Sequence, residues 1–195
     1  MKRGFGFAIA LALAIAAPAT AQEVPQDNAE VAAMFAADQS QRMADTDDHE
    51  AAARADEQRR MHIRELFEAG ELKTGADYFG AAFIFQHGNE PRDYLLAHVL
   101  AVRAAALGHR DAQWIAAATL DRYLQSIGQP QIYSTQYRFP NEGGVTMEPY
   151  DRTLLVDALR KASSAGDLAA QERKLAEYAK LVAPAKAGGD EAGSN

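Results

Sequence analysis

The sequence of 195 residues contains no cysteine and none of the short motifs that identify common catalytic or nucleotide-binding sites. The lack of cysteine excludes disulfide bonds, thiolate metal sites and a lipoprotein anchor. The missing motifs are HExxH, GxSxG, the P-loop and GxGxxG, which are typical of zinc hydrolases, serine hydrolases and nucleotide-binding proteins. The core alone must therefore hold the fold, and no motif assigns an enzyme class.

The first 21 residues have the pattern of a secretory signal peptide. Lys2 and Arg3 precede an apolar run over 5–17, and Ala19 and Ala21 place small residues at the −3 and −1 positions of a cleavage site. The apolar run is shorter than the ~20 residues of a membrane-spanning helix. We expect cleavage after Ala21, a periplasmic or secreted location and no membrane association afterwards; an uncleaved anchor is the alternative.

The mature chain is expected to be acidic. Removing residues 1–21 removes two positive charges and no negative one, so the formal net charge changes from −7 to −9. Such a chain is a poor match for nucleic acid or an anionic membrane surface, and neither is an expected partner. The sequence indicates a flexible leader at 22–28, a single helical domain at 29–183 and a disordered tail at 184–195.

Apolar residues recur mostly at helical spacing, which predicts a mainly all-α fold. Asp27 or Asn28, Thr74 and Pro91 mark helix starts, and Gly70 and Gly108 mark helix ends. The expected fold is a compact bundle of about seven helices, at 29–43, from the acidic cluster 45–48 to about 69, and at 74–87, 91–107, 111–127, 151–162 and 167–181.

The helices at 74–87 and 91–107 are apolar almost all the way round, which predicts a buried hairpin. His87 at the end of the first is either a helix cap or a functional imidazole, whose protonated form the helix dipole favours. His98 in the second is either a core histidine bonded to a carboxylate or backbone carbonyl, or a functional group. The two lie ~11 Å apart along the axis at 1.5 Å per residue, so no direct pairing is expected.

The pattern changes after Gly128. Residues 129–139 alternate with period two, and the turn cluster at 140–144 precedes a short segment at 145–147. This predicts a small β-hairpin or an extended loop near 131–147. Its amide-rich part either lines a polar cleft for a sugar or peptide or satisfies exposed helix ends.

Charged residues inside the helices offer two interpretations. Asp38 and Arg42 are four residues apart and pair on one helix face, and Asp121-Arg122 is a second charged pair. They form either a buried ion network that fixes packing or an acid–base site beside a histidine. The arginines at 54, 59, 60 and 64 are expected on a solvated face, with Asp56 able to reach Arg59 or Arg60.

The motifs together resemble a family of bacterial proteins of unknown function. They are Asp-Gln-x-x-Arg at 38–42, Asp-Tyr-Phe-x-Ala-Ala-x-Ile-Phe-Gln-His-Gly at 77–88, Asp-Tyr-Leu-Leu-Ala-His at 93–98, Asp-Arg-Tyr at 121–123 and Gln-x-Tyr-x-Thr-Gln at 131–136. The resemblance covers about 38–136 and implies a helical domain and a site location, but no activity. The family's last motif is Gln-x-Tyr-Gly-Thr-Gln, so Ser134 replaces a glycine that permits positive φ.

A weaker similarity links the small residues at 104–117 to the hairpins of tetratricopeptide or Sel1-type repeats. Ala104 to His109, then Ala112 and Ala116-Ala117, are typical of close helix packing in such a hairpin. No second copy follows at a fixed period. The alternative is ordinary close packing within a single hairpin.

We expect a non-catalytic binding or interaction module whose partner is a small polar ligand, a peptide or a protein. The alternative is a hydrolase-like enzyme, which requires a histidine, a carboxylate and the 131–136 segment to converge around a cleft. No spacing supports a metal-ligand set, and no cofactor is expected. The candidate polar site comprises Asp38, Gln39, Arg42, His87, His98, Asp121, Arg122, Gln131, Tyr133, Thr135 and Gln136.

Overall fold

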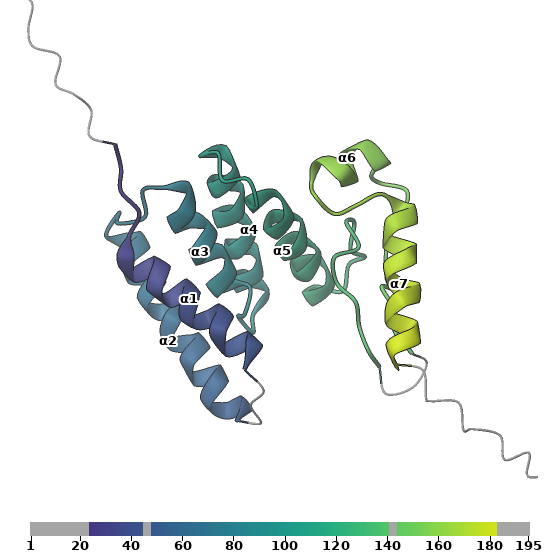
Figure 1. The fold of residues 1–195 in the computed structure, drawn as a ribbon, viewed down its shortest axis with the longest axis horizontal. Helices are drawn as coiled ribbons and strands as arrows, with labels where there is room; N and C mark the ends of the chain where they lie inside the picture. Colours follow the sequence, from purple (N-terminus) through teal and green to yellow (C-terminus); the bar gives the residue numbers. More distant parts are fainter. Residues whose placement is uncertain (1–23, 45–47, 141–143, 183–195) are drawn as a thin grey trace, which may run out of the picture.

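The computed structural model describes residues 24–44, 48–140 and 144–182, and this part of the chain is all-α without a sheet (Figure 1). The all-α prediction is therefore confirmed. The expected signal peptide and the expected tail at 184–195 lie outside the described residues, and none of the described helices is long and apolar enough to cross a bilayer. The seven helices are α1 (Ala29–Met43), α2 (His49–Glu68), α3 (Gly75–Phe85), α4 (Pro91–Ala106), α5 (Ala112–Ser126), α6 (Asp157–Ala162) and α7 (Leu168–Val182).

Helices α1 and α3 begin at one shared polar junction. The Asn28 side chain accepts hydrogen bonds from the backbone N–H groups of Glu30 and Val31 and caps α1. Thr74 and Asp77 form the capping box of α3. The buried Asp77 carboxylate also accepts the Asn28 backbone N–H at 2.7 Å, which joins the two helix starts. The helix-start signals at Asn28 and Thr74 are thus confirmed.

Helix α3 is the centre of the packing, because it contacts α1, α2, α4 and α5. Figure 1 shows α1 and α2 side by side at one end and α3, α4 and α5 following in order toward α7. Small side chains let α3, α4 and α5 approach closely, while Ile84, Phe85 and Ile115 supply the larger core groups. The buried alanines are Ala81, Ala82, Ala97, Ala101, Ala104, Ala112, Ala117 and Ala118.

The expectation that both helices of the α3–α4 hairpin are buried all round is wrong for α4. Leu95, Val99 and Val102 lie one or two turns apart on a single face and are 40%, 55% and 49% exposed. The face packed against α3 and α5 consists instead of Ala97, Ala101 and neighbouring buried residues. Apolar composition alone did not show that Leu100 and the alanines face the core while the other large residues face solvent.

The segment after α5 is an extended loop rather than a hairpin. Arg138 and Thr146 form one isolated antiparallel bridge, and Gln131 and Tyr150 form one isolated parallel bridge. The expected helix at 151–162 is also too long, because α6 covers only Asp157–Ala162. The Asp151 carboxylate instead accepts the backbone N–H groups of Thr153 and Leu154 and closes a turn.

A buried polar node attaches α6 and α7 to this loop. The Tyr150 hydroxyl donates to Gln171 Oε1 at 2.6 Å and accepts a hydrogen bond from Arg160 Nε at 3.0 Å. Gln171 Nε2 donates to the Tyr133 carbonyl at 2.8 Å. Tyr150, Arg160 and Gln171 are all buried, so these hydrogen bonds help to position the C-terminal helices.

The turn between α3 and α4 has no room for a side chain at Gly88. A Cβ atom there lies only 2.3 Å from Asp93 Cβ, closer than real contacts allow. We therefore expect Gly88→Ala to lower the free energy of unfolding by about 2 kcal/mol, within the range for overpacking. Urea denaturation measures the loss. Gly128→Ala is the comparison, because Gly128 has open space around it, so any loss there comes from its φ of +74° and not from a clash. A Gly88 variant no less stable than the Gly128 variant contradicts the prediction.

Candidate functional site

The predicted site residues separate into three places in the structure. Asp38, Gln39, Arg42, His87 and Arg122 gather around the turn between α3 and α4. Asp121 and the residues at 131–136 form a second group on the far side of α5. His98 contacts the backbone of α5 at a third place. We call the first group, together with Asp56 and Arg59, the arginine corner: Asp38, Gln39, Arg42, Asp56, Arg59, His87 and Arg122.

Asp38 of α1 is the buried carboxylate of the arginine corner. It accepts a hydrogen bond from Gln39 Nε2 at 2.8 Å and from Arg42 Nη2 at 3.4 Å. His87 Nε2 lies 3.5 Å from its second oxygen, Oδ2. Burial opposes ionisation of Asp38, but its contacts with His87, Gln39 and Arg42 prevail and lower the carboxyl pKa below its ordinary value of 3.8. The predicted Asp38–Arg42 pair is confirmed.

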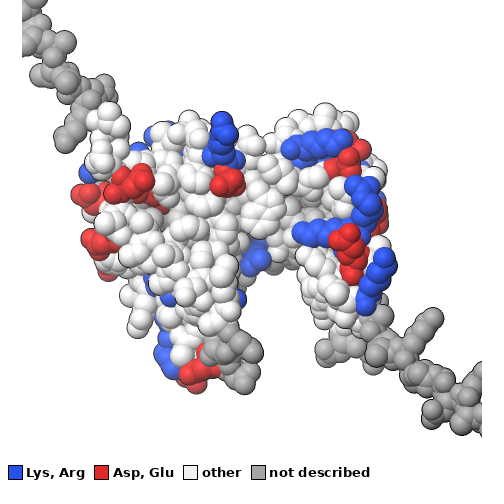
Figure 2. Space-filling view, viewed as in Figure 1, with Lys and Arg blue, Asp and Glu red and all other residues white. Residues whose placement is uncertain are grey.

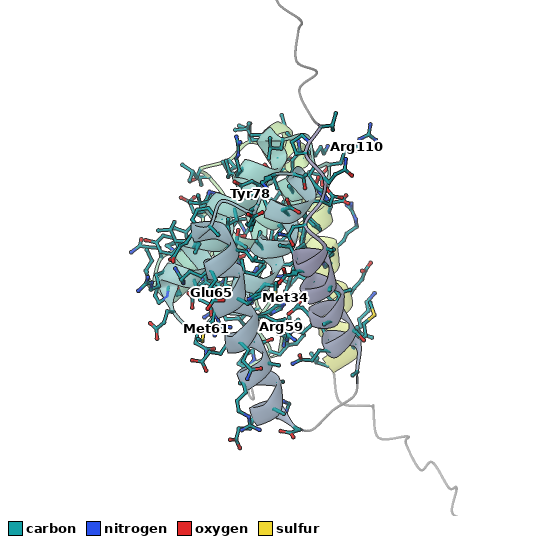
Figure 3. The ribbon with its side chains drawn as sticks, turned by 90° about the vertical axis from the view of Figure 1, so that its left-hand side faces the viewer. Met34, Arg59, Met61, Glu65, Tyr78 and Arg110 are labelled. Carbon is teal, nitrogen blue, oxygen red and sulfur yellow. The ribbon has the colours of Figure 1, made fainter. Side chains whose placement is uncertain are left out.

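Helix α2 contributes two charged residues to the corner that the sequence did not single out as site residues. Asp56 is buried and accepts a hydrogen bond from Arg42 Nη2 at 2.6 Å and from Arg59 Nη2 at 2.6 Å. Figure 3 shows Arg59 in the space between α1 and α2. The expected solvated face is right for Arg54, which pairs with Glu50 at the surface, but wrong for Arg59 and Arg60. Both of those side chains are only 12% exposed.

Two arginines from different helices hold the backbone of the α3–α4 turn. Arg60 of α2 donates to the His87 carbonyl at 2.9 Å. Arg122 of α5 donates to the Gln86 carbonyl at 3.0 Å, and its guanidinium group lies 5.9 Å from the centre of the Tyr94 ring. These carbonyls follow the end of α3 and lack helical partners, so the arginines satisfy them. Burial lowers the pKa of Arg122, and the nearby positive charge of Arg42 lowers it further.

His87 is held close to Asp38 but not in an ideal hydrogen bond. Its Nε2 atom is removed from solvent and has no hydrogen-bond partner, although Asp38 Oδ2 lies 3.5 Å away. We interpret the contact as an ion pair when His87 is protonated, because the distance exceeds the usual 2.7–3.2 Å of an N–H···O bond. The side chain is 20% exposed, so the ring is also open to solvent.

Asp121 serves a different purpose from the arginine corner. Its carboxylate accepts the backbone N–H groups of Ile132 (2.7 Å), Tyr133 (3.0 Å) and Thr135 (2.9 Å), and the Thr135 hydroxyl at 2.8 Å. Asp121 is fully buried, and no ion pair joins it to a described cation. Burial raises the pKa of its carboxyl in spite of these hydrogen bonds. Asp121 therefore takes no part in an ion network with Asp38, which was one of the two interpretations of these charged residues.

The other residues of the Gln-x-Tyr-x-Thr-Gln motif fix the same loop from within. Gln131 is buried, donates to the carbonyls of Gln136 and Met147, and accepts the Gln136 N–H at 3.0 Å. Gln136 donates to the Ala118 carbonyl of α5 at 3.1 Å. Of the two interpretations of this segment, the geometry favours satisfaction of internal backbone groups over a ligand-lined cleft.

Ser134 keeps the backbone conformation that a glycine would permit. Its φ is +56°, in the left-handed region that side chains rarely adopt. The buried Ser134 hydroxyl donates to the Met147 sulfur at 2.8 Å. The loop thus retains a turn with positive φ at the position where the resemblance places glycine.

His98 is half-buried, and its Nδ1 atom lies 2.9 Å from the Ala116 carbonyl of α5. A neutral ring therefore donates from Nδ1 and leaves Nε2 as an acceptor. This is the core histidine bonded to a backbone carbonyl that the sequence offered as one alternative. Tyr133 and Gln113 share with it a shallow recess of about 320 Å³.

Sequence reasoning missed an aromatic surface that crosses α1, α3 and α5. Phe79 and Phe83 have ring centres 4.8 Å apart, and Phe35 lies 5.6 and 5.3 Å from them. Trp114 stacks at 6.5 Å from Phe83 and remains 41% exposed. The four-residue spacing of the two α3 phenylalanines is the signal that points to one face. We call Phe35, Phe79, Phe83 and Trp114 the aromatic row.

Comparison of the chain with family models, with curated proteins and with solved structures found no match. Within residues 24–44, 48–140 and 144–182, no three His, Asp or Glu side chains are grouped to hold a metal ion. The candidates for a functional role are the arginine corner, the aromatic row and the loop at 131–136 that Asp121 holds, which we call the anchored loop.

The anchored loop gives a direct prediction for Asp121→Asn. An amide has one acceptor oxygen and turns its NH₂ group toward donors, so buried N–H groups of the loop lose their partner. We expect the free energy of unfolding to fall by about 3 kcal/mol, since hydrogen bonds to a buried charge are costly to leave unmade. Urea denaturation with Asp151→Asn as control measures this, because Asp151 closes an exposed turn. A loss equal to that of the control would show that Asp121 is not an anchor.

Proposed function

We propose that this chain is an exported, non-catalytic binding module that holds an apolar peptide segment of a partner protein on the aromatic row. The observation that carries the proposal is the exposed Trp114 at one end of a continuous set of rings on α1, α3 and α5. Large exposed aromatic side chains are typical of interaction surfaces. The predicted polar residues at 121 and 131–136, by contrast, are engaged in holding the loop.

Two recesses lie at the ends of the aromatic row. One has a volume of about 230 Å³ and is lined by Phe35, Phe79 and Gly80. The other, of about 170 Å³, lies between Trp114 of α5 and Lys174 of α7. A Cβ atom at Gly80 would lie 3.1 Å from Val31 and 3.3 Å from Phe35, so the glycine keeps α1 and α3 close beneath the first recess. An extended peptide can place one apolar side chain in each recess.

Charges at the two ends favour one orientation of such a peptide. Asp27 and Asp111 line the first recess, and Lys174 lines the second. The Lys174 ammonium lies 5.3 Å from the centre of the Tyr137 ring and pairs with no carboxylate of the described residues. A segment with a basic residue at one end, apolar residues in the middle and an acidic residue at the other end complements this surface.

Selection of peptides from a random phage-displayed library on the immobilised full chain tests the proposal. We expect a consensus of apolar residues flanked by opposite charges, and a selected peptide should shift the emission of Trp114, the single tryptophan. Trp114→Ala should weaken its binding by ~10-fold or more, as expected for an aromatic anchor that the bound peptide covers.

The matched control is Val99→Ala, which removes an exposed apolar side chain on α4, outside the aromatic row. It should leave peptide affinity unchanged. Peptides without a shared apolar pattern, or equal affinity for Trp114→Ala and wild type, would rule out the aromatic row as the binding surface.

A hydrolytic function is the second candidate, and the His87–Asp38 pair favours it, because a carboxylate beside an imidazole can orient a general base. A panel of chromogenic ester, phosphate and glycoside substrates tests this directly. Turnover that His87→Gln abolishes while the melting temperature is retained would support an enzyme. The binding-module proposal expects no turnover by the wild-type chain, and equal background with the variant.

A further inference from the structure

We propose that the arginine corner binds a small oxyanion, of which phosphate is the representative, between the guanidinium groups of Arg122 and Arg42. The site is separate from the aromatic row and does not depend on the proposed peptide function. It rests on the placement of two guanidinium groups around the α3–α4 turn, those of Arg122 of α5 and Arg42 of α1, next to His87.

Arg122 is a partly buried cation without a carboxylate partner. Among the described residues, no aspartate or glutamate forms an ion pair with it, although fifteen ion pairs are present elsewhere. Its contacts are one hydrogen bond of 3.0 Å to the Gln86 carbonyl and the Tyr94 ring at 5.9 Å. Neither neutralises the charge, and a guanidinium group has five N–H donors to satisfy. The remaining donors are suited to a planar or tetrahedral oxyanion.

The corner as a whole carries more positive than negative charge. Asp38 and Asp56 are its two carboxylates, and they are shared by the guanidinium groups of Arg42 and Arg59. Arg122 is therefore the uncompensated third cation. Arg122 donates to the Gln86 carbonyl, and Arg42 contacts Asp38, which lies 3.5 Å from the neighbouring His87, so the two guanidinium groups flank the same turn.

Arg42 can serve two structural carboxylates and still reach a ligand. Its closest contacts with Asp38 and Asp56 both come from one nitrogen, Nη2. The side chain is 34% exposed, so part of the guanidinium group faces solvent. The Nη1 and Nε donors of Arg42 form no hydrogen bond with the described residues and can each donate to a bound oxyanion.

His87 lies in the turn that the two arginines flank. The arginine contacts at Gln86 and His87 fix the backbone that carries the ring. Its Nε2 atom is closed to solvent and lies 3.5 Å from Asp38 Oδ2, while the side chain as a whole is 20% exposed, so the ring can report on an anion held beside it.

The corner is open enough for a small ligand to enter. Figure 2 shows Lys or Arg atoms at the back of the hollow that opens below α5, between the helices at one end of the molecule and α7. The His87 and Arg42 side chains are 20% and 34% exposed, whereas Asp38 beneath them is closed to solvent. Charges in such a half-buried position interact more strongly with an anion than fully exposed ones do.

Titration of the full chain with inorganic phosphate at constant ionic strength tests the proposal, followed by calorimetry and by the His87 ring resonances in NMR. We expect saturable binding and a shift of the His87 signals. Arg122→Gln should raise the phosphate Kd at least ~10-fold, and Arg122→Lys, which keeps the charge but not the planar fork, should give an intermediate value. Arg92→Gln, at an exposed arginine outside the corner, should bind as wild type does.

Parallel titrations identify the anion. Glycerol 3-phosphate binding as tightly as phosphate indicates a phosphoryl ligand, and acetate binding more tightly than both indicates a carboxylate ligand; either supports an oxyanion site. Equal affinity of wild type and Arg122→Gln, or an effect that sodium chloride reproduces, overturns the proposal. If Arg122→Gln fails to fold, Arg122→Lys decides by the same criterion. Trp114→Ala should retain phosphate binding, so this site and the aromatic row are tested independently.

Discussion

A single buried carboxylate, Asp121, determines how the C-terminal third of this molecule is placed. It gathers four donors from residues 132–135 and so turns an extended loop into a fixed surface on α5. That surface presents the Tyr133 carbonyl to Gln171, and Gln171 in turn holds Tyr150, which contacts Arg160. The chain has no cysteine, so the loop and helices α6 and α7 are held by these hydrogen bonds and by ring contacts such as Tyr137 with Tyr178.

The need of buried polar groups for hydrogen-bond partners also explains why the most distinctive sequence motif is not a ligand site. In Gln-x-Tyr-x-Thr-Gln, Gln131 and Gln136 bond to internal carbonyls, and Thr135 bonds to Asp121. Buried amide and hydroxyl groups require partners, so a polar motif can reflect structural demand as readily as recognition. The surfaces suited to binding lie elsewhere, on the aromatic row and in the arginine corner.

Local signals predicted much of the fold. The cap at Asn28, the box at Thr74 and the proline at Pro91 placed three helix starts, because each acts within one turn of the chain. Long-range partners could not be read in the same way. Arg59 and Arg60 have the spacing of a solvated face, yet α1 and the α3–α4 turn cover them. The helix expected at 151–156 is replaced by a turn because Asp151 caps local N–H groups.

In the candidate site, too, local contacts could be predicted from the sequence and long-range contacts could not. Asp38 with Arg42 was predictable at four-residue spacing, and the separate places of His87 and His98 followed from helix geometry. The positions of Asp56 of α2 and Arg122 of α5 beside these residues could not be predicted, because they depend on tertiary packing.

Native-state hydrogen exchange at the backbone amides of Ile132, Tyr133 and Thr135 tests the central role of Asp121 most directly. If the carboxylate anchors the loop, these three amides exchange only with global unfolding, at rates that follow the stability of the core amides in α3 and α5. Exchange as fast as that of an exposed loop, with the α5 amides still protected, would contradict it.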